Sequence, residues 1–218
     1  MLRRSRNGFT LIEMMVVVAI AAVLVAMAVP AMDDWSTNQR AKSASRAMAN
    51  ALSAGRSEAI RTGNHHIVFF QLDAQGNLLL DGDGIAVPLA IVNDDRPGGP
   101  NQNCTIDAGE TVGIGRAEPG VAWGVAKASA RVPTDFGAGS IATGSSFTDP
   151  SGNPATWVLF RPDGVPISFK ADCTLGGTGS GAGAIYLSSG RRDYAVVLTA
   201  LGGIRTHAWD NGGGQWTN

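Results

Sequence analysis

The chain has 218 residues, of which 44% are hydrophobic and only 16% are charged, and its formal net charge is −1. This composition excludes a chain that is disordered throughout and a protein that attracts polyanions through a large overall positive charge. The 29 glycines and the low charged fraction indicate an apolar segment followed by a long, loop-rich remainder.

The first thirty residues have the pattern of a membrane segment. Residues 1–8 carry three arginines, and from Phe9 to Val29 every side chain is apolar or small except Thr10 and Glu13. A helix of this length is about 32 Å long, which matches a hydrocarbon core of about 30 Å. Because the basic cluster precedes the segment, the positive-inside rule predicts a cytoplasmic N-terminus and an exported C-terminal part. Removing residues 1–8 would leave a net charge of about −4.

A cleavable secretory signal is the alternative interpretation of this segment. Such signals have a shorter apolar stretch, about 7–15 residues, and a small-x-small cleavage site, for which Ala26, Ala28 and Ala31 give only a weak match. Glu13 also argues against it, because a carboxylate within an apolar segment costs several kcal/mol unless it is paired. The simpler explanation for Glu13 is that its carboxylate reaches back to the cytoplasmic interface.

The run GFTLIEMMVVVAIAAVLVAMAVP, from Gly8 to Pro30, resembles the N-terminal signature of type IV pilins and pseudopilins. The resemblance implies cleavage after Gly8 by a prepilin peptidase, N-methylation of Phe9 and a role for Glu13 in assembly with other pilins or pseudopilins. A free amine at Phe9 and a carboxylate at Glu13 have complementary charges, so neighbouring helices can pair them in a medium of low dielectric constant. Pro30 resembles the proline that kinks this helix in the family.

The helical pattern continues over residues 31–62. Small or apolar side chains recur at helical spacing, at Ala41, Ala44, Met48, Leu52 and Ala59, and most arginines and lysines lie on other faces. Gly63 and Asn64 supply a stop signal. We therefore predict one long helix whose first half lies in the membrane and whose second half packs on a domain.

The remainder predicts an antiparallel β domain. Strand patterns cover His65–Leu72, with residues 78–80 pairing back as a hairpin, and then residues 157–160, 165–169, 184–187, 194–198 and 203–208. Residues 81–156 are expected to be insertion-like, with short strands near 87–92, 111–114 and 120–125. The expected division is a leader at 1–8, a transmembrane helix at 9–30, an amphipathic helix at 31–62 and a β-rich domain at 63–218.

Three further segments resemble the GspH/FimT family of pilin-like proteins. They are Leu52–Phe69 (LSAGRSEAIRTGNHHIVF), Phe160–Gly164 (FRPDG) and Leu201–Arg205 (LGGIR). The resemblance covers both ends of the chain but not the middle. It implies a pilin-like α+β fold in which the long helix packs on a C-terminal antiparallel β domain.

Two cysteines, Cys104 and Cys173, lie in the part expected to be exported. In an oxidising compartment they would form a disulfide, and closing a loop of about 70 residues contributes about 4 kcal/mol in the chain-entropy model. The alternative is two unpaired thiols on separate loops, because neither cysteine has the spacing of a metal site.

Residues of catalytic or metal-binding pattern are not found, so we expect no enzyme, no cofactor and no metal. His65 and His66 face opposite sides of a strand, and His207 stands alone, which favours strand or surface histidines. A group of acids raises a calcium hypothesis, but the DGDG stretch lacks the glutamate of an EF-hand, which favours solvated turn acids. This group is Asp73, Asp81, Asp83, Asp94 and Asp95.

Two functions remain. The first is a minor pseudopilin in the inner membrane, with a periplasmic β domain, that builds the pseudopilus of a type II secretion system. The second is a FimT-like minor pilin of a type IV pilus, which takes part in pilus assembly and binds DNA during uptake. The Gly-Arg-x-Arg motif of such pilins matches Gly202–Arg205 only in part, because Gly203 replaces the first arginine; Arg191 and Arg192 are the candidates to compensate. An unrelated anchored protein is the remaining alternative.

Overall fold

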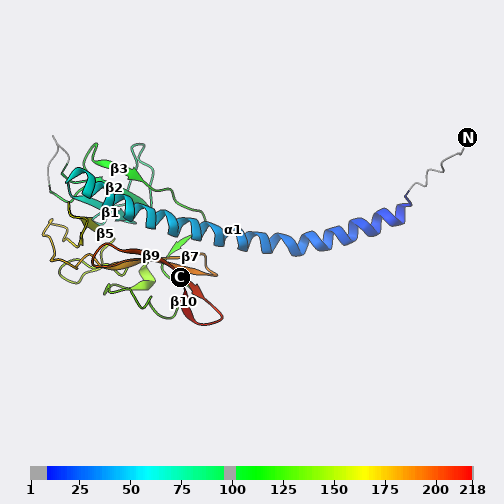
Figure 1. Cartoon of the computed structure of the whole chain (residues 1–218). Coiled ribbons are helices and arrows are strands. Elements are labelled where there is room, and N and C mark those ends of the chain that lie inside the picture. Colours follow the sequence, from blue (N-terminus) through cyan, green and yellow to red (C-terminus); the bar gives the residue numbers. More distant parts are fainter. Residues whose placement is uncertain (1–8, 96–101, 218) are drawn as a thin grey trace, which may run out of the picture.

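The computed structural model describes residues 9–95 and 102–217, and it contains one long helix followed by a β domain. Helix α1 runs from Leu11 to Thr62, through Pro30 without interruption. It ends at Gly63, which has φ 73° and donates its N–H to the Ala59 carbonyl at 3.0 Å. Because this left-handed conformation is strained for other residues, glycine is the expected residue at this position. Figure 1 shows α1 as a curved rod whose first half extends away from the β domain.

The β domain contains two antiparallel sheets of five strands each. The first has the order β3-β2-β1-β5-β6, made of Thr111–Ile114, Leu89–Asn93, His66–Phe70, Trp157–Phe160 and Pro166–Ile167. The second has the order β10-β9-β8-β7-β4, made of Gln215–Thr217, Ile204–Asp210, Asp193–Leu198, Gly183–Ser188 and Ala122–Trp123. A short 3₁₀ helix, η1, covers Ile141–Thr143.

The second half of α1 packs against both sheets. All five members of the predicted stripe, Ala41, Ala44, Met48, Leu52 and Ala59, are buried. Ala44, Met48, Leu52 and Ala59 form one core with side chains from both sheets, which include Val68, Phe160, Ile185, Val196 and Leu198. The small residues bring the helix close to the first sheet, so that a Cβ on Gly55 would lie 2.6 Å from Val68 Cγ2. The pilin-like α+β fold predicted from the sequence is confirmed.

The central strands of the first sheet are buried on both faces, whereas its edge strand β3 is largely exposed. Strand β1 is buried at all five positions, with Val68 and Phe70 toward α1 and Ile67 and Phe69 in a second core on the other side. Loops that precede and follow the strands cover this second core, and Cys104 contributes to it. A strand that is buried on both faces has a continuous apolar sequence, which explains the run IVFF.

Predictions about the middle of the chain hold only in part. The predicted hairpin is limited to one antiparallel bridge between Leu72 and Leu78, and residues 78–80 do not extend it along β1, which lies between β2 and β5. The strands expected near 87–92, 111–114 and 120–125 are present as β2, β3 and β4. Residues 81–156 are nevertheless not an insertion, because they supply β2 and β3 to the first sheet and the buried side chains of Val132 and Phe147 to the cores.

Candidate functional site

The start of α1 is held by a reciprocal pair of contacts between Thr10 and Glu13. Thr10 is the N-cap, and its hydroxyl oxygen accepts the Glu13 N–H at 3.3 Å. The Glu13 Oε2 atom in turn accepts the Thr10 N–H at 2.9 Å and the Thr10 hydroxyl at 2.8 Å. This is a capping box, which satisfies backbone N–H groups that have no partner within the helix.

Sequence reasoning noted Glu13 but did not assign Thr10. The signal was present, because Thr-x-x-Glu immediately before an apolar run is the sequence form of a capping box. In the separate subunit the Glu13 carboxylate is therefore bound to its own helix terminus. Its second oxygen has no hydrogen bond within the described residues, so the carboxylate can also accept a bond from a neighbouring molecule.

The helix surface that follows this cap is apolar and has no partner within the described chain. Its side chains from Phe9 to Ala28 are exposed, including Phe9 at 83% and Leu11 at 77%. Leu11–Thr62 is one helix with a segment long and apolar enough to cross a membrane, judged by length and composition alone. A continuous apolar surface of this length requires lipid or other apolar helices around it. Gly8, the predicted cleavage position, lies outside the described residues.

The predicted DNA-binding arginines are not brought together. Arg205 is exposed on β9 opposite Val197, whereas Arg191 and Arg192 precede the first residue of β8, Asp193. Five residues of antiparallel strand separate these positions, about 17 Å. Arg191 Nε instead contacts Asp34 Oδ1 on α1 at 2.6 Å. Arg191 and Arg192, which were expected to compensate for the missing arginine, therefore do not form a cluster with Arg205.

A groove between α1 and the edge of the second sheet holds cations that sequence reasoning did not group. Lys42 and Arg46 lie on α1, and Arg192 lies across from them, around a volume of about 360 Å³. Within the described residues none of these three side chains forms an ion pair. Grouping them required the three-dimensional fold, because Lys42 and Arg192 are 150 residues apart in the sequence.

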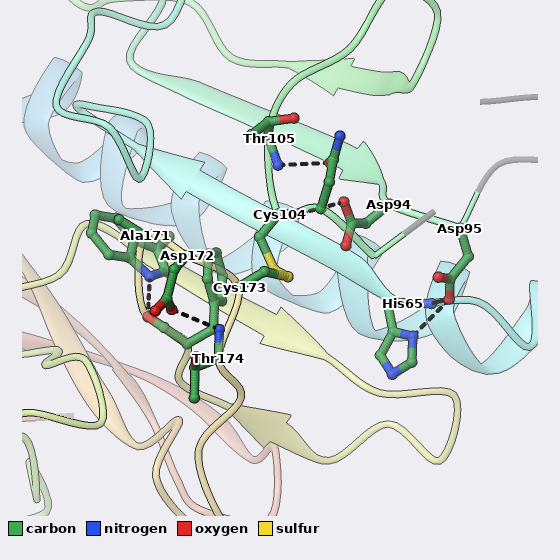
Figure 2. The surroundings of a disulfide bond; sticks show 12 residues. His65, Asp94, Asp95, Cys104, Thr105, Ala171, Asp172, Cys173 and Thr174 are labelled. Atoms are coloured by element: carbon green, nitrogen blue, oxygen red, sulfur yellow. Dashed lines mark hydrogen bonds and ion pairs between the residues drawn. A yellow bond between two sulfur atoms is a disulfide. The ribbon is translucent and has the colours of Figure 1, made fainter. Parts of the chain in front are cut away.

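Cys104 and Cys173 form a disulfide that joins the loops over the second core. Figure 2 shows this bond beside the Asp94 carboxylate, with the His65–Asp95 pair nearby. His65 Nδ1 lies 2.6 Å from Asp95 Oδ2, and the Cys104 N–H donates to Asp94 Oδ1 at 2.9 Å. One carboxylate oxygen of Asp94 lies within 4.8 Å of both sulfur atoms. With the sulfurs bonded to each other, they offer no thiolates to a metal ion.

The three histidines are strand residues or their neighbours, and two of them are buried. Burial lowers the pKa of His66, which is fully enclosed, and it also lowers the pKa of His207, with a smaller contribution from Arg205. His65 is held by Asp95 at the start of the first sheet. Among the described residues, no nucleophile is hydrogen-bonded to any of these rings.

Together, the exposed apolar half-helix, the acidic residue at its start and the β domain at its end have the arrangement of a pilin-like protein, and they suggest anchoring in a membrane. Residues 3–29 match the family model described as the prokaryotic N-terminal methylation motif. This prepilin-type signal indicates a type IV pilin-like protein, and it implies processing by a prepilin peptidase and assembly with other pilins. It points to a structural protein and not to an enzyme. No curated protein and no solved structure matches the chain significantly.

Proposed function

We propose that the chain is a minor pseudopilin of GspH/FimT type, a structural subunit of the pseudopilus of a type II secretion system. The observation that carries the proposal is the unpartnered apolar surface of α1 from Phe9 to Ala28, which begins at the Thr10–Glu13 cap. This surface suits a helix that moves from lipid into a bundle of similar helices, because both surroundings are apolar.

The assembly step follows from the position of Glu13. After cleavage behind Gly8, Phe9 carries a positively charged amine that is methylated. A neighbouring subunit's amine can bind the free oxygen of Glu13, and this pairing offsets the cost of placing a carboxylate among apolar helices. Residues 9–30 then form the membrane segment, residues 31–62 the spine of the domain and residues 63–218 the periplasmic domain, with the N-terminus on the cytoplasmic side.

A FimT-like minor pilin that binds DNA is the second candidate. The groove lined by Lys42, Arg46 and Arg192 favours it, because clustered cations that have no ion-pair partner in the described part of the chain suit phosphate contacts. The separation of Arg205 from Arg191 argues against a clamp of the kind that the C-terminal motif would form.

Deletion of the gene with plasmid complementation distinguishes the two functions. The secretion proposal predicts that exported enzymes accumulate in the periplasm of the deletion strain, while pilus number and DNA uptake are unchanged. Normal secretion together with lost DNA uptake would contradict it and support the second candidate. Complementation with Lys42→Ala/Arg46→Ala tests the groove, with Arg40→Ala, exposed on the same helix, as the matched control.

A further inference from the structure

A buried carboxylate lies beside the disulfide, and the proposed role in filament assembly does not involve it. Asp94 follows β2 and is completely buried, at 0% exposure. Its Oδ1 atom accepts the Cys104 N–H, but its Oδ2 atom is buried without a hydrogen-bond partner among residues 9–95 and 102–217. A buried polar atom without a partner costs about 1–3 kcal/mol, so its retention calls for an explanation.

The two sulfur atoms differ in their surroundings. Cys104 is completely buried and packs in the second core, whereas Cys173 is only partly buried. Cys173 also lines a small cavity of about 40 Å³ together with Asp94 and His65. In the reduced protein, an oxidant arriving from solvent therefore reaches the Cys173 sulfur, and the Cys104 thiol is left to complete the bond.

The buried Cys104 thiol needs a base in order to react. Only the thiolate attacks a disulfide, and a thiol in apolar surroundings ionises with difficulty. The Asp94 carboxylate is an acceptor close to both sulfurs, because one of its oxygens lies within 4.8 Å of each of them. Aspartate accepts a proton only while it is ionised.

Asp94 is ionised at neutral pH although its environment disfavours the charge. Burial raises the pKa of Asp94 to about 6, and the carboxylates of Asp95 and Glu110 act in the same direction. The Cys104 N–H and the His65 ring act in the opposite direction. A general base is most effective when its pKa lies just below the working pH, because it is then mostly ionised and still basic enough to accept a proton.

The geometry points to Asp94 as the proton acceptor for closure of the Cys104–Cys173 disulfide by a small disulfide oxidant. The Cys173 thiolate first attacks the oxidant, forms a mixed disulfide and releases one thiolate. The Cys104 thiol then transfers its proton to Asp94 as its sulfur attacks Cys173, and the second thiolate leaves. Asp94 passes the proton to water. Two protein thiols are oxidised, and one oxidant molecule is reduced to two thiols.

The inference assumes the exported location proposed above but no particular secretion machine. It is tested on the full chain in detergent, reduced and then mixed with glutathione disulfide at pH 7, with acid quenching and intact-mass analysis. In the parent protein the mixed disulfide is short-lived. Asp94→Asn keeps an acceptor for the Cys104 N–H but is no base, so its mixed disulfide should resolve at least about tenfold more slowly.

The matched control is Asp172→Asn, which removes the same charge at an exposed carboxylate next to Cys173. This variant should resolve at the parent rate. Equal rates for Asp94→Asn and the parent would overturn the inference, as would equal slowing in both variants.

A second measurement covers the case in which reduced Asp94→Asn does not fold. In the parent protein, the rate of mixed-disulfide resolution should rise through about pH 6, where Asp94 ionises, and then reach a plateau near neutral pH. A rate that rises without a plateau to about pH 8.5, where a free thiol ionises, would overturn the inference. Circular dichroism of the reduced protein shows whether the fold is retained.

Discussion

Arg56 on α1 donates from Nε to the Gly164 carbonyl at 3.0 Å, and its Nη1 donates to the Gly202 carbonyl at 2.9 Å. One side chain thus joins the helix to two turns that are 108 and 146 residues away. These turns belong to the segments FRPDG and LGGIR, which carry part of the family resemblance. Gly164 and Gly202 have φ of 76° and 81°, and a Cβ on Gly202 would lie 2.9 Å from Arg56 Nε. These glycines therefore have a structural role.

Replacing Arg56 tests this connection. Arg56→Ala removes two charge-assisted hydrogen bonds and leaves two carbonyls without a partner, so the free energy of unfolding should fall by about 2–3 kcal/mol. Urea titration of the full chain in detergent, followed by tryptophan fluorescence, measures the change. Arg46→Ala, exposed on the same helix, should stay within about 0.5 kcal/mol of the parent. Equal effects of the two variants would show that the Arg56 contacts contribute nothing.

The close approach of α1 to β1 predicts a second effect. Gly55→Val places side-chain atoms against Val68, which a buried strand holds in place, and overpacking of this kind lowers the free energy of unfolding by about 1–3 kcal/mol. The same urea titration measures it. Ser57→Val, exposed on α1, puts the same β-branched residue into the helix and controls for helix propensity. The packing argument fails if Ser57→Val costs as much as Gly55→Val.

The disulfide predicts a large effect of reduction. The two cysteines are 69 residues apart in the sequence, so loss of the bond should lower the free energy of unfolding by about 4 kcal/mol. The urea midpoint with and without a reducing agent measures this loss. The variant Cys104→Ser/Cys173→Ser should have the midpoint of the reduced parent and should not respond to the reducing agent. A parent midpoint that reduction leaves unchanged would contradict the prediction.

The raised pKa of Asp94 predicts that the stability of the fold depends on pH. Its pKa is raised from 3.8 to about 6, so the folded state binds more protons than the unfolded state between these values. Stability contributed by the protonated carboxyl is therefore lost as the pH rises from about 4 to about 6, and it stays lost above that. The difference between the two pKa values corresponds to about 3 kcal/mol in the free energy of unfolding. Asp94→Asn should thus gain stability relative to the parent over this window.

The measurement is the difference in unfolding free energy between variant and parent at several pH values, which cancels the opposing contributions of His66 and His207. Asp172→Asn is a control of opposite sign. The Thr174 N–H holds the pKa of Asp172 below its usual value, so this carboxylate stabilises the fold at higher pH and loses that effect as the pH falls. A flat difference for Asp94→Asn from pH 4 to pH 7 would contradict the prediction.

Local sequence patterns were sufficient to predict the positions of the long helix and of several strands. The stripe on α1 and the stop at Gly63 mark the helix and its buried face, and the strands at Thr111–Ile114 and Trp157–Phe160 have the bounds that the sequence predicts. Pairing was harder to predict. The partners of β1 come from residues 89–93 and 157–160, and a run that is buried on both faces carries no information about which distant strand lies beside it. Strand β10 was missed because it is a three-residue edge strand after a glycine run.

Some residues of the candidate sites could likewise be predicted from local sequence, whereas others could not. Glu13 was recognised from the sequence because a carboxylate in an apolar segment is costly, and Thr10 was recognisable from the capping-box spacing. The distance between Arg205 and Arg191 depends on the register of β8 and β9, and the position of Asp94 beside the disulfide depends on how two loops meet. Such relationships follow only from the three-dimensional structure.

The role of Glu13 in assembly is tested most directly by the amount of protein that enters the filament. Thr10→Val removes the hydroxyl of the cap but keeps the carboxylate, and it should assemble like the parent. Glu13→Ala should be cleaved behind Gly8 and remain in the membrane at the normal level, yet be absent from purified pseudopili or pili. Incorporation of Glu13→Ala at the parent level would contradict the account.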